Sequence, residues 1–550
     1  MDRAARHPDE PHEAPDASGT STVRGMRSVL APSLCLPLAA TLLACGLTGC
    51  ASRDEAAARP DLTRYYDQEI SWEPCSREQD RTVRDETRDA GRTAECARLT
   101  VPYTYDDPGK GELRLALMRY RAADRDHRLG SLVVGFGGPG VSGLGQLGAR
   151  GPDGFSKAAG RYDLVAFDAR GAGAASPARC GTGSGLPAAA RGRDDDEDGP
   201  DAAAELADRV DDRAKALRDC AERTGAVLPY LGTAHAARDL DVLRAALGED
   251  RLNYLGYAHG TRLGAAYAHR YPHKVGRMVM DSVDDPAPDL RKNALARTAA
   301  YQKALRHAVE ICTRRGDEDC ILGSDTDRAM DSVTAAFNRL DEHPLPWVGG
   351  RTLGREAAVT QTMGLLRSRV GLPEAPNLLA AIVHRLRPGE AAHMAQEAVA
   401  RAGGKDSGDR DGAGAATAGV NCADTRSRYT ADQVAAAYDD FVEASPVFGP
   451  ALAAGMAVCT GWPQAGDDAA HDVAAPRAPK ILLHTPEFDP ATPVAWLHRM
   501  ARALGPSAVT MTDAGGGHGV YGSSDADCVN EKVDEFLLEG KLPADRTRCT

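Results

Sequence analysis

Short apolar runs alternate with longer stretches of helical periodicity in the first half of the chain. Three of these runs end in a turn rich in glycine: 131–136 before GGPG, 164–167 before DARGAG, and 252–255 before GYAHG. A fourth run covers 277–283 and follows a helical stretch that opens at Thr261. Strands that alternate with helices are typical of βαβ units. The pattern therefore predicts an α/β fold with a mostly parallel sheet flanked by helices.

Beyond about Ala287 the pattern becomes helical and stays so to Pro450. Strand-like runs return at 481–484 and 508–512, ahead of an amphipathic stretch at 529–538 that predicts a closing helix. We therefore expect a helical cap inserted into a sheet-forming core. The expected divisions are a signal segment at 1–49, a tether with an N-terminal disulfide loop at 50–98, a first core part at 99–286, the cap at 287–450 and a second core part at 451–550.

The N-terminal region has the parts of an export signal. Arg24 and Arg27 precede a mostly apolar run at 29–48, and the letters LTGC follow, ending at Cys50. A basic region, an apolar region and small residues before a cleavage point define such a signal. The cysteine makes it resemble a bacterial lipoprotein signal, and Met26 would then be the more natural start. We expect an exported protein, either anchored to a membrane by a lipid on Cys50 or secreted.

A transmembrane helix or a buried core helix is the alternative for this apolar run. Pro32 and Pro37 interrupt the run, whereas a membrane-spanning helix needs about 20 predominantly apolar residues. The two prolines therefore favour the export signal.

Cysteine usage agrees with export, because disulfides persist outside the reducing cytosol. The chain has 13 cysteines, and ten remain when Cys35, Cys45 and Cys50 are set aside. No C-x-x-C pair is present, which disfavours a zinc site. Many connectivities are open to ten thiols. Pairing of neighbours along the sequence suggests Cys75 with Cys96, Cys180 with Cys220, Cys312 with Cys320, Cys422 with Cys459, and Cys528 with Cys549.

The charge balance argues against a nucleic-acid partner. The 66 basic residues are outnumbered by 79 acidic ones, which gives a formal net charge of -13. Proteins that bind along a nucleic-acid backbone carry a basic stripe interleaved with aromatic residues. This sequence has no such stripe. We expect no nucleic acid, no cofactor and no metal.

The stretch 256–260 reads GYAHG, which has the frame of a G-x-S-x-G nucleophile elbow. In α/β hydrolases this turn lifts a serine above the sheet. Ala258 stands at the serine position. The GGPG turn at 137–140 suits a loop whose backbone N–H groups stabilise an oxyanion, although an ordinary tight turn is the alternative.

Two further residues follow in the order that α/β hydrolases use, which is nucleophile, acid, histidine. Asp489 comes shortly after the apolar run at 481–484, and His518 lies in a glycine-rich loop after the last run. Each alone has a simpler explanation, because an aspartate after a strand is often a turn or cap residue and a histidine beside glycines is often exposed. Their order favours a catalytic arrangement.

With these residues the chain resembles the secreted tripeptidyl aminopeptidases, relatives of proline iminopeptidase that have an α/β-hydrolase core and a characteristic C-terminal region. The resemblance covers about residues 70–550. The motifs that carry it are GGPGVSG at 137–143, RYDLVAFDARGAG at 161–173, LNYLGYAHGTRLGAAYAHRYP at 252–272, RMVMDSVDDP at 277–286, NCADT at 421–425, CTGWP at 459–463, FDPATPV at 488–494 and GGHGV at 516–520.

The resemblance implies roles for four residues. Asp489 would orient the histidine, and His518 would act as the general base. The oxyanion donors would be backbone N–H groups near Gly138 and of His259. Short peptides or protein N-termini are the ligands that the family implies, and the pairing of neighbouring cysteines agrees with the family's habit.

The residues that depart from the family's pattern are concentrated at the positions expected to carry the catalytic chemistry. Ala258 replaces the serine nucleophile, His259 a tyrosine, Val141 a glycine of the donor loop, and Ala175 the serine of the D-x-R-G-x-G-x-S run. An alanine at the nucleophile position cannot form an acyl-enzyme. The first hypothesis is therefore a pseudo-hydrolase that binds peptides.

Two rival hypotheses remain. One is a working exopeptidase or esterase with another nucleophile, for which Ser142 and Ser282 are the nearest serines by sequence. The other is a metal hydrolase built from His259, His518 and Asp489, but the spacing of these residues is not that of a known ligand set.

Overall fold

The computed structural model describes residues 60–75, 93–155, 157–173, 202–287, 289–316, 320–347, 352–385 and 410–550. The signal segment at 1–49, Cys50, Ala175 and Cys180 lie outside these ranges, so the expectations for them stay predictions. The compact unit that is described here begins at Arg59. No helix within the described ranges combines the length and apolar character needed to cross a bilayer.

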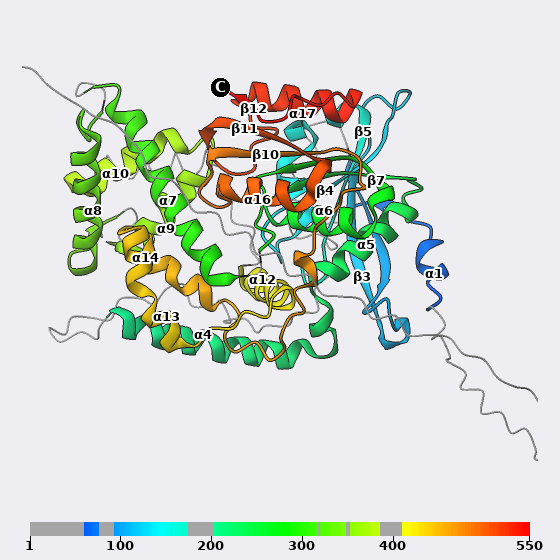
Figure 1. Ribbon diagram of the computed structural model, residues 1–550, viewed down its shortest axis with the longest axis horizontal. Helices are drawn as coiled ribbons and strands as arrows, with labels where there is room; N and C mark the ends of the chain where they lie inside the picture. Colours follow the sequence, from blue (N-terminus) through cyan, green and yellow to red (C-terminus); the bar gives the residue numbers. More distant parts are fainter. Residues whose placement is uncertain are drawn as a thin grey trace, which may run out of the picture. The chain divides into compact units, whose positions relative to one another are not determined.

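A sheet with ten strands among the described residues forms the centre of the molecule (Figure 1). Its order is β1-β2-β3-β5-β4-β6-β7-β10-β11-β12, and every neighbouring pair from β5 to β12 is parallel. The pairs from β1 to β5 are antiparallel. The predicted α/β class with a mostly parallel sheet is therefore confirmed. The strands are β1 Glu73–Pro74, β2 Glu95–Pro102, β3 Glu112–Tyr120, β4 Gly130–Gly135, β5 Tyr162–Phe167, β6 Leu252–Tyr257, β7 Val275–Asp281, β10 Ile481–Phe488, β11 Ala508–Gly516 and β12 Thr547–Cys549.

Helices cover both faces of this sheet, and each face has its own apolar core. Alternate residues of a strand point to opposite faces, so β4 contributes Leu132 and Val134 to one core and Val133 to the other. Strands buried on both faces are mainly apolar throughout, which is why the short runs were visible in the sequence. The core that contains Val133 includes helices α5 Thr233–Ala246, α6 His259–Arg270 and α16 Val494–Leu504. The opposite core includes α2 Gly143–Arg150, α3 Ala158–Arg161 and α17 Asp527–Glu539.

The N-terminal antiparallel strands were not predicted. β2 begins at Glu95, so the boundary expected at residue 98 falls inside a strand. Arg98 and Thr100 interrupt the apolar residues of β2, whereas β3 has a short apolar run at 115–118 with no glycine-rich turn directly after it. The disulfide between Cys75 and Cys96 joins the residue after β1 to β2.

The cap enters the sheet between two neighbouring strands. β7 and β10 pair directly in parallel, with Met278 opposite Ile481, although about 200 residues separate them in sequence. The intervening segment is mainly helical and has its own apolar core, which includes Tyr301, Phe337 and Phe448. Its helices are α7 Leu290–Thr313, α8 Thr326–Glu342, α9 Arg355–Arg367, α10 Ala375–His384, α12 Arg410–Asp424, α13 Ala431–Ala436, α14 Tyr438–Ala444 and α15 Gly449–Leu452, and a short hairpin pairs β8 Leu345–Pro346 with β9 Thr352–Leu353.

One helix of the predicted first core part packs with the cap instead. The apolar stripe of α4 Ala202–Thr224 places Leu206 and Val210 against Val434 and Phe441 of the cap helices. Figure 1 shows α4 running alongside α13. The cap is therefore built from two separate stretches of sequence, because the apolar face of an amphipathic helix packs wherever a matching surface is available.

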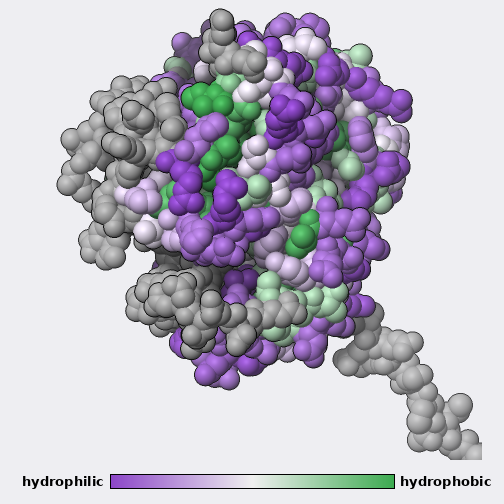
Figure 2. All heavy atoms as spheres, turned by 90° about the vertical axis from the view of Figure 1, so that its left-hand side faces the viewer, coloured by the Kyte–Doolittle hydropathy of each residue, from purple (hydrophilic) through white to green (hydrophobic). Residues whose placement is uncertain are grey.

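The outer surface of the cap is mostly polar. Figure 2 shows hydrophilic side chains over most of that face, with apolar ones in a limited area. Among the described residues, Ile321 and Val370 are the large apolar side chains that stand exposed. The apolar residues of the cap helices are thus mainly used in the interior.

Four of the predicted disulfides lie wholly within the described residues and are present. They are Cys75–Cys96, Cys312–Cys320, Cys422–Cys459 and Cys528–Cys549. Cys220 is also disulfide-bonded, while its predicted partner Cys180 lies outside the described residues.

Candidate active site

Ala258 occupies the apex of a sharp turn between β6 and α6. Its backbone has φ 48° and ψ -117°, a conformation that a residue with a Cβ rarely adopts. The turn is tied down at both ends: the Ala258 N–H donates to the Asp281 carbonyl at 3.1 Å, and its carbonyl accepts from the Thr261 N–H at 2.9 Å and the Thr261 hydroxyl at 2.6 Å. The elbow geometry is thus complete, but its apex carries a methyl group.

Two glycines allow close packing around this elbow. A Cβ built on Gly137 would lie 2.3 Å from the Cβ of Ala258, and one built on Gly260 would lie 2.0 Å from the carbonyl oxygen of Gly135. Both distances are far shorter than a van der Waals contact. Only glycine therefore lets the loop after β4 and the start of α6 approach each other here.

Asp489 and His518 meet beside this turn. His518 Nδ1 lies 2.9 Å from one carboxylate oxygen of Asp489 and 3.2 Å from the other. Asp489 follows β10 and is buried, and His518 follows β11 with 13% of its side chain exposed. Burial by itself raises the pKa of Asp489, but the charge and hydrogen bond of His518 and the Thr492 amide hold that pKa below its usual value. The carboxylate thus fixes Nδ1 and leaves Nε2 as the free ring nitrogen.

Further groups hold the Asp489 carboxylate in place. It accepts hydrogen bonds from the Ala491 N–H at 2.8 Å, the Thr492 N–H at 2.9 Å and the Thr492 hydroxyl at 2.8 Å. The nearby Ser282 hydroxyl favours the ionised form of this carboxylate, which lowers its pKa, and accepts the Gly519 N–H at 2.8 Å. Asp489 is therefore an oriented acceptor for the histidine and is not free to bind a ligand.

The two serines considered as alternative nucleophiles are both occupied. Ser282 is fully buried, and its hydroxyl accepts the Gly519 N–H at 2.8 Å. Ser142 caps α2: its hydroxyl donates to Asp168 at 2.9 Å and accepts the Gly145 N–H at 3.0 Å. Neither serine lines the cavity that Ala258 and His518 share.

The residues expected as oxyanion donors line the same cavity as Ala258. His259 is the first residue of α6, so its backbone N–H has no partner inside the helix. Gly138 has φ +79° and lines the same cavity. A Cβ on Gly138 would come within 3.0 Å of a Val141 methyl. Val141, which replaces a glycine of the family, therefore packs closely against Gly138 within the same loop.

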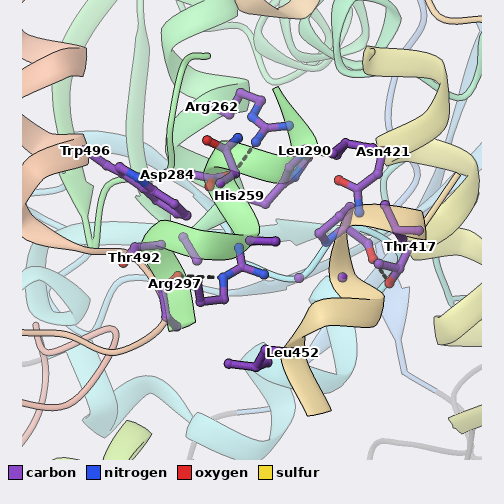
Figure 3. A pocket seen from close by; sticks show the side chains of 18 of the residues that line it. His259, Arg262, Asp284, Leu290, Arg297, Thr417, Asn421, Leu452, Thr492 and Trp496 are labelled. Atoms are coloured by element: carbon purple, nitrogen blue, oxygen red, sulfur yellow. Dashed lines mark hydrogen bonds and ion pairs between the residues drawn. The ribbon is translucent and has the colours of Figure 1, made fainter. Parts of the chain in front are cut away.

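A cavity of about 410 Å³ lies between the elbow and the cap. A volume of this size suits a small organic ligand. Ala258, His518, Gly138 and His259 all contribute to its wall, together with residues of α7 and α12. Figure 3 shows these walls, with Arg262 and Asp284 pointing toward one another. The structure thus brings all the residues predicted for the catalytic chemistry to one site, Asp489 lying directly behind His518.

A buried polar cluster behind His259 was not predicted from the sequence. The His259 Nε2 lies 3.1 Å from the Thr233 hydroxyl and 3.8 Å from the Asp424 carboxylate. Arg262 pairs with Asp284 at 2.8 Å and lies 3.8 Å from Asp424. Burial raises the pKa of Asp424, but the neighbouring His259 and Arg262 hold that pKa below its usual value. The NCADT motif contains Asp424, so that motif was the signal available in the sequence.

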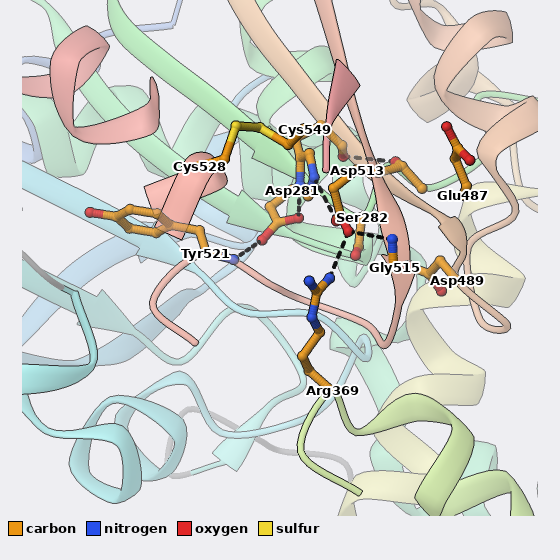
Figure 4. Close-up of polar contacts among 12 residues, drawn as sticks. Asp281, Ser282, Arg369, Glu487, Asp489, Asp513, Gly515, Tyr521, Cys528 and Cys549 are labelled. Carbon is orange, nitrogen blue, oxygen red and sulfur yellow. Dashed lines mark hydrogen bonds and ion pairs between the residues drawn. A yellow bond between two sulfur atoms is a disulfide. The ribbon is translucent and has the colours of Figure 1, made fainter. Parts of the chain in front are cut away.

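A second buried network lies at the ends of β7, β10 and β11 (Figure 4). His484 Nδ1 lies 2.7 Å from Asp281, and Nε2 lies 3.3 Å from Asp513. Asp513 also binds Arg369 of the cap at 2.7 Å. Burial lowers the pKa of His484, but Asp281 and Asp513 outweigh burial and raise it to about 9. This network joins the cap to the strand ends that carry the site.

The three residues weighed as metal ligands lie at one site but do not form a ligand set. His259 contacts Thr233 and Asp424, whereas His518 contacts Asp489. In the part of the chain that the structure describes, no three His, Cys, Asp or Glu side chains form a group that could hold a metal ion.

Comparison with known proteins gives two family matches and several full-length relatives. The family described as TAP-like protein matches residues 445–549, and the family described as alpha/beta hydrolase fold matches residues 132–319. A tripeptidyl aminopeptidase of Streptomyces coelicolor is 30% identical over 505 residues, which cover 87% of this chain and 86% of the relative.

Two mycobacterial proteins are similarly related. Carboxylesterase B of Mycobacterium tuberculosis is 31% identical over 521 residues, covering 94% of this chain and 95% of the relative. Serine protease Hip1 of the same species is 29% identical over 510 residues, covering 88% and 91%. The relatives thus include a peptidase, a protease and an esterase by name, and the similarity extends through both core parts and the cap.

Proposed function

The chain belongs to the tripeptidyl aminopeptidase-like family of α/β hydrolases, and we propose that it is an exported, catalytically impaired member that binds peptides in the cavity beside Ala258. The observation that carries the proposal is Ala258 itself. It stands at the apex of an intact elbow, in the same cavity wall as a histidine that Asp489 orients. The elbow and the Asp489–His518 pair of an acyl-transfer site are in place, and the attacking oxygen is missing.

The missing hydroxyl has a large chemical consequence. Removing the nucleophile from a serine peptidase costs about a millionfold in turnover. The residual rate, about a thousandfold to ten-thousandfold over water, comes from the oxyanion hole and from binding. His518 could still accept a proton, but the methyl side chain of Ala258 has no acidic proton to donate. Binding without efficient turnover is therefore the function that this site supports.

The shape of the site agrees with a binding role. A residue other than glycine in the conformation of Ala258 costs of order 1–3 kcal/mol. The glycine contacts, the buried Asp489 and the cavity all remain around it. A chain that had lost all use of the pocket would not need this combination.

A working exopeptidase or esterase is the second candidate, and it would need another nucleophile. Ser142 and Ser282 are both committed to hydrogen bonds away from the cavity. The threonines that line the cavity are Thr417, Thr425 and Thr492. The Thr492 hydroxyl donates to Asp489, and the Thr417 hydroxyl donates to the Pro139 carbonyl. This candidate is therefore less well supported.

Two measurements on the purified protein separate these candidates. One is turnover of tripeptide chromogenic substrates, with covalent labelling by a serine-directed phosphonate. The other is calorimetric binding of the same tripeptides. We expect binding without turnover above background and without labelling. Turnover together with labelling would instead support the exopeptidase, and the labelled residue would identify its nucleophile.

Membrane attachment is a further part of the proposal. The letters LTGC that end at Cys50 support lipidation of that cysteine, and the disulfides agree with an oxidising compartment. The protein would then hold its cavity outside the cytosol, where short peptides and protein N-termini are available. The partners proposed are these peptides and the membrane that holds the anchor.

A further inference from the structure

Arg213 of α4 lines the cavity without a counter-charge. The structure gives its guanidinium no hydrogen bond or ion pair to any described residue, and its Nε is buried without a partner. Burial is the cause that lowers the pKa of Arg213. A cation that is partly removed from water and unpaired is costly to the folded state. An anion in the cavity would remove that cost.

Arg297 and Arg367 add to the positive charge of the same wall. Arg297 Nε donates to the Ala491 carbonyl at 3.1 Å, and its guanidinium lies 5.6 Å from the centre of the Trp496 ring. Arg367 lies beside the Tyr301 hydroxyl, whose ionisation it favours. Neither arginine pairs with a carboxylate among the described residues. Both guanidinium groups therefore remain available to a ligand.

The carboxylates near the cavity are already engaged. Asp284 is the acidic residue among the described residues of the wall, and it pairs with Arg262 at 2.8 Å. Asp424 accepts from Thr233 at 2.6 Å, and Asp489 accepts from His518 and Thr492. The described wall offers no free carboxylate to a peptide's N-terminal ammonium group.

The wall also holds buried polar atoms without a hydrogen-bond partner. Among the described residues that line the cavity these are Arg213 Nε, Arg262 Nε, Trp496 Nε1, Asn293 Oδ1 and His471 Nε2. Guanidinium and indole nitrogens are donors only, whereas an amide oxygen is an acceptor. These atoms therefore suit both donors and acceptors of a ligand, and the preference for an anion rests on the arginines of the wall.

From these observations we propose that the cavity selects its ligand by an anionic group, and that the ligand is a peptide whose carboxylate faces Arg213, Arg297 and Arg367. This deepens the proposed function and rests on it, because it names the chemical class of the bound peptide. A guanidinium binds a carboxylate through two parallel hydrogen bonds, which gives orientation as well as charge. A ligand that is held by its free N-terminal amine is disfavoured by the same three cations.

The test compares four probes by calorimetry at low ionic strength. Succinyl-trialanine amide carries one carboxylate, acetyl-trialanine amide carries no charge, trialanine amide carries one ammonium group, and inorganic phosphate tests a free oxyanion. We expect the succinyl peptide to bind at least about tenfold more tightly than the acetyl peptide, with the cationic peptide weakest. Salt should weaken the succinyl peptide most, because ionic strength screens charge interactions.

Arg213→Gln should remove most of the preference for the succinyl peptide over the acetyl peptide. Arg218→Gln is the matched control, because Arg218 lies on the same helix, is exposed and is not part of the cavity wall. Thermal unfolding supplies a second readout. Without ligand, Arg213→Gln should keep or raise the melting temperature, since it removes an uncompensated charge, whereas a structural role for Arg213 would lower it.

The outcomes separate the failure of this inference from that of the proposed function. Tighter binding of the cationic peptide than of the succinyl peptide would overturn the anionic preference and leave a peptide-binding protein. Binding of phosphate alone, or of none of the four probes, would overturn both. An unchanged preference in Arg213→Gln would also overturn the inference.

Discussion

His518 Nδ1 lies 2.9 Å from the carboxylate of Asp489, although 29 residues separate the two in sequence. The pair is held at the carboxyl ends of β10 and β11, and Thr492 and the Ala491 N–H complete the hydrogen bonds of the carboxylate. In a working serine peptidase this arrangement would prepare the histidine to accept a proton from the nucleophile. Here it is directed at a cavity whose elbow residue has only a methyl group.

Restoring the hydroxyl should restore reactivity toward a covalent probe. In Ala258→Ser the new hydroxyl takes the elbow position next to the His518 imidazole, so we expect rapid labelling by a serine-directed phosphonate, measured by intact mass. Cleavage of tripeptide substrates should stay poor, because His259 and Val141 alter the oxyanion loop and losing one donor costs about a hundredfold or more.

The double variant Ala258→Ser with His518→Ala is the control for that experiment. General-base catalysis contributes about a hundredfold to ten-thousandfold, so labelling of the double variant should slow by at least about a hundredfold. An Ala258→Ser protein that folds normally but takes no label would show that the geometry around the elbow no longer supports attack.

Glycine at the same position should stabilise the protein. Ala258 has φ 48°, where a Cβ is strained and glycine is not. We expect Ala258→Gly to raise the free energy of unfolding by roughly 1 kcal/mol, the relief of strain outweighing the entropy that glycine gains in the unfolded chain. Denaturant unfolding monitored by circular dichroism measures the change.

The matched control for glycine is Ala299→Gly, an exposed position inside α7. There the same substitution should lower stability by about 1 kcal/mol, as in an ordinary helix. Equal destabilisation at both positions would contradict the strained conformation of Ala258.

The buried His484 should make stability depend on pH in the alkaline range. Asp281 and Asp513 raise its pKa from 6.5 to about 9 against the effect of burial. Because the folded state holds this proton more tightly than the unfolded chain, the stabilisation is complete below pH 6.5 and is lost as the pH rises toward 9. Melting temperatures measured across this range should therefore fall.

Asp281→Asn tests the origin of this effect. It removes one of the two charges that support protonated His484, so the decline in melting temperature should begin at a lower pH than in the wild type. Asp331→Asn, at an exposed position of α8, should leave the profile unchanged. A wild-type melting temperature that stays constant from pH 6.5 to about 9 would mean that His484 is not protonated in the folded state.

Membrane attachment depends on one residue that the sequence singles out. Cys50→Ser removes the thiol that would carry the lipid, so we expect the variant to move from the membrane fraction to the culture medium, as measured by immunoblotting of both. Cys45→Ser, a neighbouring cysteine in the same apolar run, should keep the protein attached. A Cys50→Ser protein that stays in the membrane would refute lipidation at this site.

The sequence by itself determined the sheet class, the elbow and the order of the acid and the histidine. These features are local: each depends on a short apolar run and on the turn that follows it. A parallel strand buried on both faces has to be continuously apolar, and an elbow needs small residues at fixed offsets. Cysteines close in sequence, such as Cys312 and Cys320, also pair readily, because closing a short loop costs little chain entropy.

Only the tertiary structure decided which distant groups meet in the cavity. Asp424 reaches His259 from 165 residues away in sequence, and Leu206 of α4 packs into the cap instead of the first core part. No local pattern encodes such meetings, because they depend on which amphipathic faces pack together. The same packing left Arg213 in the cavity wall without a carboxylate and placed the Ser282 hydroxyl where it accepts the Gly519 N–H. Charge and hydrogen bonding at the site therefore follow from packing, since the partner of a buried polar group is set by the neighbours that the fold brings to it.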